Sequence, residues 1–423
     1  MKPLVLEYLC THTLRQLEED HGVKARPNSH FDKFSLNYDQ ILSKNGDPVS
    51  EQCRGMVIRP SATLTAKMLR DETNRGNEPL SAARWRDRIM GNVELLAWPM
   101  NRFYNYGDVS CAPVDWSDPG LRVYEKLDGT MCVVYWDSLH VKWHVATRGV
   151  SEADLPITKE SMQIGDMTFS ELFLKALIET RVANSGTMIE WDVDGPDKVV
   201  HLNKELTYVF ELTSPFNRVV VKYDESRVAL LAARHTDTGR EVRIEDVNMQ
   251  WVNRPQSWKL SEPVALQAFV ESSDPSKLEG AVVVDSRFNR VKVKSKAYVL
   301  SSRAKDLVTV SRRSALDAIL QGKIDDVISI VEKDVADELR KMQDAARRYV
   351  IMVDKNFADW KTTSNGSRKD FAAKVLASDD WNAPYFNLWE GRASNASEWI
   401  EKNALDGKLS SGTLDFLLKK MGL

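Results

Sequence analysis

A lysine in the first half of the chain has neighbours that suit covalent chemistry. Lys126 ends a predicted strand and begins the sequence K-L-D-G, so that Asp128 and Gly129 follow it closely. An Asp-Gly turn lets the backbone pass close to a bound nucleotide, and the lysine amine could then act as a nucleophile. The tetrapeptide alone is weak evidence, because a hairpin turn with a solvated lysine has the same sequence.

Other charged residues strengthen the chemical interpretation. Lys292 and Lys294 are two residues apart in a predicted strand, so their side chains share one face. Two neighbouring ammonium groups favour an anion such as a triphosphate between them, although a solvated strand face is the alternative. Glu211 and Glu279 lie in apolar strand sequences, where an unpaired carboxylate is costly. We therefore expect a functional partner for each carboxylate.

The order and spacing of short blocks around these residues resembles the covalent nucleotidyltransferase superfamily of ligases and capping enzymes. Within it, the details resemble the phage RNA ligase 1 family, the tRNA-repair type. The resemblance covers about residues 34–330, and the remainder is similar only in being helical. The matching blocks are SLNYDQ, EQCRGMVI, MNRFYNYGD, EKLDGT, ATRG, FELTSPFNRVVV, LEGAVVV, KVKSKAYV and GKIDD.

This resemblance implies an ATP-dependent RNA ligase that joins 5′-phosphate and 3′-hydroxyl RNA ends through a lysyl-AMP and an RNA-adenylate. It implies ATP and Mg²⁺ (with Mn²⁺ as a substitute) as cofactors, and RNA, single-stranded or with broken tRNA ends, as the substrate. It also implies an end-healing kinase/phosphatase as a partner in RNA repair.

The resemblance assigns roles to individual residues. Lys126 is the nucleophile, Tyr298 is needed for ligation, and Glu279 acts near the metal. Asp325 and Asp326 match a metal-binding pair, although two carboxylates in the first turn of a helix also suit its macrodipole. The expected ATP-binding residues are Tyr38, Arg54, Arg102, Glu125, Asp128, Gly129, Arg148, Glu211, Glu279, Lys292 and Lys294.

Some features depart from the family pattern or have other interpretations. Arg102 and Arg148 stand where the pattern has lysine, so the charge is kept but the donor becomes a planar fork. The charged stretch 61–91 is longer than expected. Tyr38 and Tyr298 could also be core aromatic residues.

The lysine must lose its proton before it attacks. Its ordinary pKa is about 10.4, and we expect nearby cations such as Arg54, Lys292 and Lys294 to disfavour its charged form. Lys126 then attacks the α-phosphorus of ATP and expels pyrophosphate.

Two other classes of function stay open. DNA ligases and capping nucleotidyltransferases follow the K-x-K block with a β-barrel, whereas helical spacing dominates here after residue 300. The second class is a non-catalytic protein, either a nucleic-acid-binding factor or a phage assembly factor, for example in tail-fibre attachment. Such a protein has no physical reason to keep Lys126, Glu211, Glu279, Lys292 and Lys294 together.

The pattern of apolar residues predicts an α+β fold, with an antiparallel-sheet nucleotidyltransferase (adenylyltransferase) domain followed by an all-helical domain. We place the first domain at residues 1–300, with an N-terminal subregion over about 1–115, and the helical domain, a candidate for RNA specificity, at 301–423. The predicted helices are 4–20, 162–184, 315–320, 327–330 and 335–342, and the predicted strands are 55–58, 93–98, 123–126, 131–136, 141–147, 187–193, 207–212, 218–223, 228–232, 280–285 and 290–294.

Composition sets the remaining limits. The chain is 43% hydrophobic and 28% charged with a net charge of −3, which is typical of a soluble globular protein. Its four cysteines form no zinc-like spacing and are expected to stay reduced. We expect no signal peptide, no membrane span and no membrane partner, and therefore a cytoplasmic protein, acting in host cytoplasm if virus-encoded.

Overall fold

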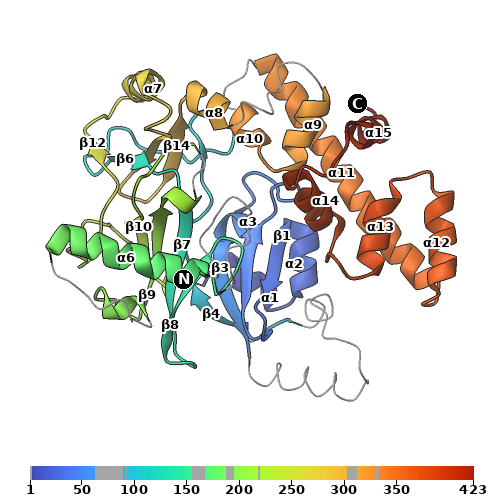
Figure 1. The fold of residues 1–423 in the computed structure, drawn as a ribbon, viewed down its shortest axis with the longest axis horizontal. Helices are drawn as coiled ribbons and strands as arrows, with labels where there is room; N and C mark the ends of the chain where they lie inside the picture. The colour runs from blue at the N-terminus through green and yellow to red at the C-terminus, as the bar shows by residue number, and fades with distance from the viewer. Residues whose placement is uncertain are drawn as a thin grey trace. The chain divides into compact units, whose positions relative to one another are not determined.

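The computed structural model describes residues 2–61, 89–91, 93–154, 167–186, 195–217, 220–302, 312–328 and 333–423. The chain divides into two compact units, the first formed by Met1–Asp39 with Ser43–Ser302 and the second by Gln40–Leu42 with Arg303–Leu423. Three antiparallel-rich sheets lie in the first unit, and helices make up the second (Figure 1). The predicted α+β class with a helical C-terminal region is therefore confirmed. No described helix is both long and apolar enough to cross a bilayer.

The first sheet contains four antiparallel strands in the order β1 (Val23–Pro27), β2 (Phe34–Tyr38), β3 (Arg54–Pro60) and β4 (Val93–Ala97). The helices α1 (Leu4–Leu9), α2 (Leu14–His21) and α3 (Pro48–Gln52) accompany it. The single helix predicted over 4–20 is wrong, because Thr13 and Gln16 form a capping box that starts a new helix. Neither β1 nor β2 is among the strands predicted from the sequence.

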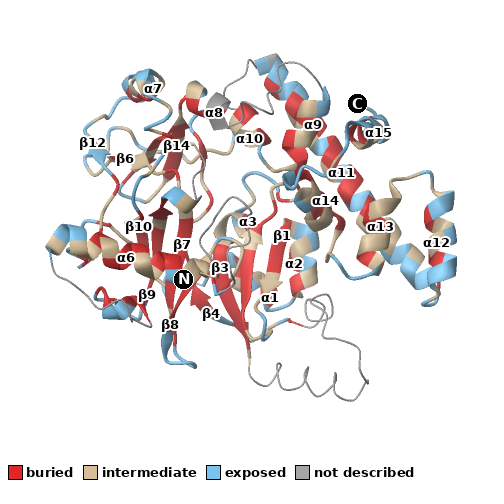
Figure 2. Ribbon diagram, viewed as in Figure 1, coloured by how far each residue is buried: buried red, intermediate tan, exposed pale blue. Residues whose placement is uncertain are grey.

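The second sheet has the strand order β11-β10-β9-β7-β8. The helix α6 (Phe169–Ser185) packs on one face, where Phe173 and Leu177 join an apolar cluster with Phe210. The opposite face meets β3 and β4 through Val57, Ala97 and other buried residues (Figure 2). The strands are β7 (Thr130–Asp137), β8 (Lys142–Thr147), β9 (Leu206–Thr213), β10 (Arg227–His235) and β11 (Glu241–Val242).

The third sheet has the order β12-β6-β13-β14-β5, and only the β14–β5 pair is parallel. One face is apolar, with Val123, Ala281, Val283, Val291 and Val293 buried beside the helix α7 (Pro263–Ser272). Because side chains alternate along a strand, the lysines of β6 and β14 share the other face. The strands are β5 (Tyr104–Asn105), β6 (Arg122–Lys126), β12 (Ser257–Trp258), β13 (Gly280–Val284) and β14 (Arg290–Lys294).

Most predicted strands are confirmed, but one is not. Residues 220–223 form no strand, since the N–H groups of Val220 and Val221 donate to the carboxylate of Asp128 rather than to another strand. The strand predicted at 187–193 lies outside the described residues, as do most of the stretch 61–91 and the first turn of the helix predicted at 162–184. Short 3-10 turns occur at Pro196–Lys198 and Pro215–Asn217.

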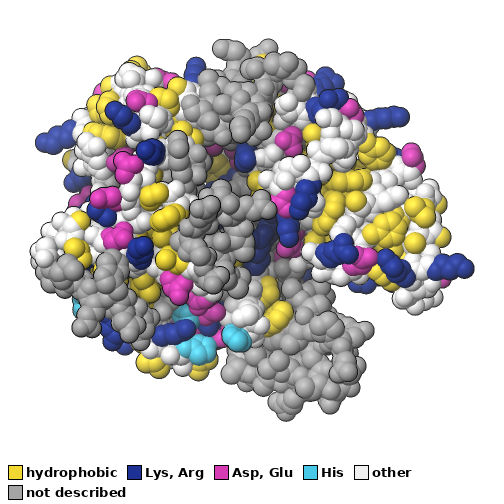
Figure 3. All heavy atoms as spheres, viewed as in Figure 1, with side chains coloured by type: hydrophobic (Ala, Val, Ile, Leu, Met, Phe, Trp, Pro, Cys, Tyr) yellow, Lys and Arg dark blue, Asp and Glu magenta, His cyan; other side chains and the backbone are white. Residues whose placement is uncertain are grey.

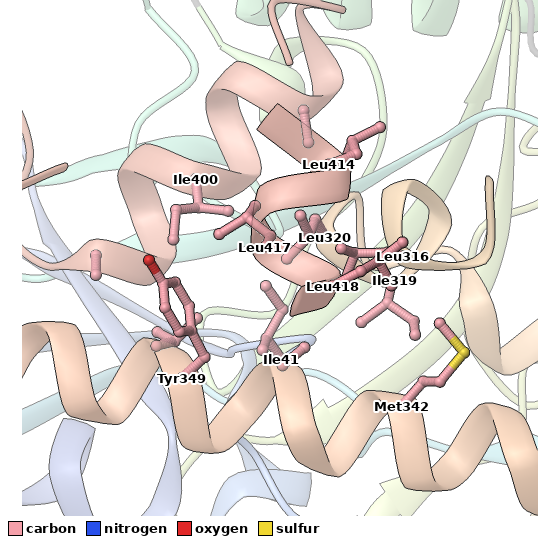
Figure 4. Packing of buried hydrophobic residues seen from close by; sticks show 14 of the residues in the cluster. Ile41, Leu316, Ile319, Leu320, Met342, Tyr349, Ile400, Leu414, Leu417 and Leu418 are labelled. Atoms are coloured by element: carbon pink, nitrogen blue, oxygen red, sulfur yellow. The ribbon is translucent and has the colours of Figure 1, made fainter. Parts of the chain in front are cut away.

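Helices account for the regular structure of the second unit, and its described residues from 312 onward contain no strand. Its core includes Leu316, Tyr349, Ile400 and Leu417, and Ile41 from the short segment Gln40–Leu42 inserts among them (Figure 4). The helices are α9 (Arg312–Leu320), α10 (Ile324–Ile328), α11 (Lys333–Thr363), α12 (Arg368–Ala377), α13 (Asn382–Trp389), α14 (Ala396–Leu405) and α15 (Ser411–Met421), whereas α8 (Lys296–Ser302) ends the first unit.

Candidate active site

Strand pairing brings two of the predicted lysines together. Gly280 of β13 lies opposite Lys126 of β6 on one side and opposite Lys294 of β14 on the other. A side chain at position 280 would meet the carbonyl oxygen of Val293 at 2.1 Å, so the close strand pairing requires glycine. The register therefore fixes the two lysines in one row across three strands.

The carboxylate of Glu279 lies between these two ammonium groups. Lys126 Nζ is 2.7 Å from Glu279 Oε2, and Lys294 Nζ is 2.9 Å from Glu279 Oε1. Burial opposes ionisation of Glu279, but the two lysines outweigh it and hold the pKa of this carboxyl below its ordinary value. The charged group in contact with Lys126 is thus a carboxylate, and not one of the cations that we expected from the sequence.

The turn after Lys126 is held by its own carboxylate. Asp128 is buried, and its Oδ2 accepts hydrogen bonds of 2.8 Å from the N–H groups of Val220 and Val221. Its Oδ1 accepts a bond of 2.9 Å from the hydroxyl of Tyr298. Because both oxygens bind the protein itself, we assign Asp128 a positioning role rather than the expected contact with ATP. Tyr298, placed by α8, supports the same turn.

Gly129 connects this turn to the second sheet. Its N–H donates to Glu211 Oε1 at 3.1 Å, and a methyl group at this position would lie 2.3 Å from the carbonyl oxygen of Leu212. Burial raises the pKa of Glu211 to about 7, Glu279 adds to the rise, and Lys126 and Arg54 oppose it. Glu211 is therefore poised between its charged and neutral forms at neutral pH.

Four cations from different segments surround the ring of Tyr38. The guanidinium carbon of Arg102 lies 4.4 Å from the ring centroid and that of Arg148 lies 5.7 Å from it. Burial favours the neutral phenol, but the charges of Arg148, Arg102, Arg54 and Lys292 lower the pKa of Tyr38 to about 8. So many cations around one neutral ring form a site for an anion.

Two of these arginines differ in how they are held. Arg102 is buried and donates to Ser43 Oγ at 3.1 Å and Asn45 Oδ1 at 2.9 Å. Arg54 stacks on Phe103 at 4.9 Å, and its buried Nη1 makes no hydrogen bond to any described residue. A buried cationic donor without an acceptor is costly, so Arg54 is the group of this cluster that most needs an anionic ligand.

The Tyr38 cluster and the Lys126 row are parts of one site, because Arg54 and Lys126 both act on the charge of Glu211. Glu125 is different, since strand alternation turns it away from the lysine face toward the Ala281 side of the sheet. Its side chain therefore does not join the row of lysines, and its role in ATP binding stays a prediction. Phe103 and Tyr223 were not predicted as site residues. Their places are shown by the contact of Phe103 with Arg54 and of the Tyr223 hydroxyl with the N–H of Asp128.

Asp325 and Asp326 stand in the first turn of α10, in the second unit. Gln343 donates to Asp325 Oδ1 at 3.2 Å. This is the arrangement expected for carboxylates at a helix N-terminus, and their role as metal ligands stays a prediction.

Comparison with known proteins finds relatives that are named for RNA ligation. Over 330 residues the chain is 25% identical to a putative bifunctional polynucleotide kinase/RNA ligase of Autographa californica nuclear polyhedrosis virus, covering 77% of this chain and 41% of that protein. Over 289 residues it is 25% identical to an RNA ligase of Rhodothermus phage RM378, covering 56% of this chain and 62% of that protein. The chain is similar to RNA ligases. The resemblance predicted from the sequence is thereby confirmed, and the chain spans less than two thirds of the length of either relative.

Solved structures give weaker likenesses. An archaeal ATP-dependent RNA ligase matches with a TM-score of 0.35 and 13% identity, covering 79% of this chain and 76% of its own. A mutant Naegleria gruberi RNA ligase with ATP and Mn matches with a TM-score of 0.28 and 12% identity, covering 65% of this chain and 95% of its own. Scores this low do not define a common fold by themselves. No protein-family model matches the chain.

Proposed function

We propose that this chain is an ATP-dependent RNA ligase whose nucleophile is Lys126. The observation that supports this best is the row across β6, β13 and β14, in which Lys126 and Lys294 share the buried carboxylate of Glu279. A structural ion pair needs neither a second lysine nor the cation cluster around Tyr38. Both are explained if a nucleoside triphosphate occupies the space that these cations surround.

The reaction has three transfers. In the first, Lys126 Nζ forms a bond to the α-phosphorus of ATP while the bond to the β-phosphate oxygen breaks and pyrophosphate leaves. Glu279 Oε2, 2.7 Å from Nζ, would orient the amine, which must release its proton to solvent before it attacks. In the second, the AMP passes from lysine to the 5′-phosphate of RNA, and in the third a 3′-hydroxyl attacks that phosphorus and releases AMP.

The remaining residues bind and position the nucleotide. Lys292 and Lys294 would hold the phosphates from β14, and Arg54 would supply its free buried donor to the same group. Glu211, poised near neutrality, would contact the nucleoside, and the Asp128–Tyr298 bond would hold the K-x-D-G turn. Arg102 and Arg148 would keep the anion site positive around Tyr38.

A divalent metal also fits the chemistry of the site. Glu279 offers a carboxylate, the kind of ligand that Mg²⁺ and Mn²⁺ prefer, next to the lysines that would bind phosphate. When bound, such an ion neutralises charge on the phosphates. We propose Mg²⁺ as the natural ion and Mn²⁺ as a substitute.

The substrate and partners follow from the same proposal. Both curated relatives are named for RNA ligation, and one name joins it to a polynucleotide kinase. We therefore propose RNA with 5′-phosphate and 3′-hydroxyl ends, a separate end-healing enzyme upstream, and a role in RNA repair. The helical unit would select the RNA, and a cytoplasmic location stays a prediction.

The test is covalent labelling with ATP that carries radioactive phosphorus at the α-position, in the presence of Mg²⁺, followed by a denaturing gel. The wild type should acquire label and Lys126→Ala should not. Lys259→Ala, which removes an exposed lysine outside the site, is the matched control and should label normally. Label in Lys126→Ala would remove the central claim.

Two further measurements separate the other functions. Competition by unlabelled GTP in the labelling reaction would indicate a capping enzyme. Incubation with nicked DNA or nicked RNA shows which strand is sealed, and so distinguishes a DNA ligase from an RNA ligase. Pyrophosphate first removes any AMP that is already bound to the purified protein. If the wild type then acquires no label, a non-catalytic binding or assembly role replaces the proposal.

A further inference from the structure

A second cluster of charged and imidazole side chains lies at the other end of β7, around the turn to β8. Asp137 is the last residue of β7, and His140 and His144 follow it in the sequence D-S-L-H-V-K-W-H. His140 Nδ1 is 2.8 Å and His144 Nε2 is 3.3 Å from the same oxygen, Asp137 Oδ2. One potential ligand atom from each residue lies within 4.8 Å of the other two. The proposed ATP site uses none of these residues.

The environment of His144 shows what this cluster lacks. Its ring is buried, and Nδ1 lies 3.1 Å from Glu152 Oε1. A carboxylate at that nitrogen fixes the proton on Nδ1, so that Nε2 carries the lone pair. Yet Nε2 is buried, makes no hydrogen bond to any residue that the structure describes, and faces Asp137 Oδ2. A lone pair that faces a carboxylate oxygen is repulsive unless a cation lies between them.

One ligand distance suits a tetrahedral metal, whereas the 2.8 Å hydrogen-bond distance between His140 Nδ1 and Asp137 Oδ2 would lengthen when the ion binds. Ligand atoms bound at about 2.0–2.2 Å at the corners of a tetrahedron are roughly 3.3–3.6 Å apart, close to the 3.3 Å between His144 Nε2 and Asp137 Oδ2. Glu152 behind His144 completes the carboxylate–histidine–metal arrangement that orients such ligands. Two imidazoles with one carboxylate favour Zn²⁺ and similar ions over Mg²⁺. We propose that Asp137, His140 and His144 bind a divalent transition metal such as Zn²⁺, with water as the fourth ligand.

The charge of the cluster must allow a third cation, because Lys33 and Arg59 already bind Asp137 and each lies 3.4 Å from His140 Nδ1. The ion-paired groups comprise four carboxylates and two permanent cations, so with neutral imidazoles they carry two excess negative charges, which a divalent ion balances. Lys142, opposite Asp137 on β8, is exposed and screened by water. The carboxylates are those of Asp32, Glu94, Asp137 and Glu152.

The cluster is also accessible. The side chain of His140 is 42% exposed, whereas Asp137 is fully buried, so an ion can enter from the His140 side. Histidine side chains are visible beside acidic and basic ones on one face of the molecule (Figure 3). A bound ion would tie β7 to β8 at the end opposite the Lys126 turn, which directly precedes β7. The site is therefore a structural clamp for the strand that follows the nucleophile.

The experiment uses the full chain after dialysis against a chelator. Titration with Zn²⁺ in a calorimeter, and with Co²⁺ while its visible absorption is recorded, measures affinity and coordination without any ligase reaction. We expect about one ion per chain and the intense absorption of tetrahedral Co²⁺. His140→Ala should lower the affinity at least about tenfold, and His201→Ala, which removes an exposed histidine elsewhere, should not. Addition of Mg²⁺ at millimolar concentration should not displace the ion.

Three results would overturn the proposal: no binding by the wild type, equal binding by His140→Ala, or an octahedral Co²⁺ spectrum with ready displacement by Mg²⁺. Circular dichroism checks that His140→Ala is folded, and if it is not, His140→Gln takes its place. If the wild type binds nothing, the cluster is a buried ion-pair network in which Lys33 and Arg59 bind Asp137 and the two histidines pack beside it.

Discussion

Replacing Glu211 by glutamine should stabilise the protein above neutral pH while it impairs nucleotidyl transfer. Glutamine has the same shape, and its oxygen can still accept the bond from the N–H of Gly129. The change removes a carboxylate whose pKa burial raises from 4.5 to about 7. A raised carboxyl pKa means that ionisation opposes folding, so the wild type is fully stable below about pH 4.5 and loses stability as the pH rises through about 7.

The size of this effect follows from the pKa. Each unit corresponds to 1.36 kcal/mol, so a rise from 4.5 to about 7 costs the wild type up to about 3 kcal/mol at pH 8. Glu211 is only partly buried by surface area, so solvent reduces this penalty and we expect about 1–3 kcal/mol. Glu211→Gln avoids the loss, and its advantage over the wild type should grow between pH 4.5 and pH 8.

Urea unfolding of both proteins at pH 5 and pH 8 measures this difference, and labelling with ATP at pH 8 measures the function. We expect similar stabilities at pH 5, a more stable variant at pH 8, and a variant that labels at least about tenfold more slowly. A stability difference that is the same at both pH values would refute the electrostatic reasoning. A stabilised variant with normal labelling would refute the functional role of Glu211 alone.

Two further substitutions test the geometry of the site. Gly129→Ala places a methyl group 2.3 Å from the carbonyl oxygen of Leu212 and should cost about 1–3 kcal/mol or more in urea unfolding, whereas Gly412→Ala meets nothing closer than 3.9 Å and should not. Arg102→Lys keeps the charge beside Tyr38 but loses the planar fork that binds two side-chain oxygens. Its KM for ATP should rise several-fold with little change in stability, and an unchanged KM would contradict its place in the anion site.

The features that depend on local pattern could be predicted from the amino-acid sequence alone. Alternating apolar residues predicted most strands of the three sheets, and apolar residues three and four positions apart predicted the helical region. Both patterns arise because a strand or helix that buries one face repeats apolar residues with its own structural period. The K-x-D-G and K-x-K spacings also indicated the lysines, since their faces follow from strand geometry.

Contacts between segments that are far apart in the sequence could not be predicted, and they became known only from the tertiary structure. Nothing local to Asp128 shows that its carboxylate holds residues 220 and 221 and Tyr298, an arrangement that also explains why the predicted strand there does not form. The same is true of Glu279 as the partner of Lys126, because the register across three strands selects it. Likewise, D-x-x-H-x-x-x-H is an ordinary spacing until folding brings Glu152 behind His144 and leaves its Nε2 without a hydrogen bond from the described part of the chain. Local sequence fixes which face a side chain takes, but packing of separate segments fixes its partners and therefore its charge.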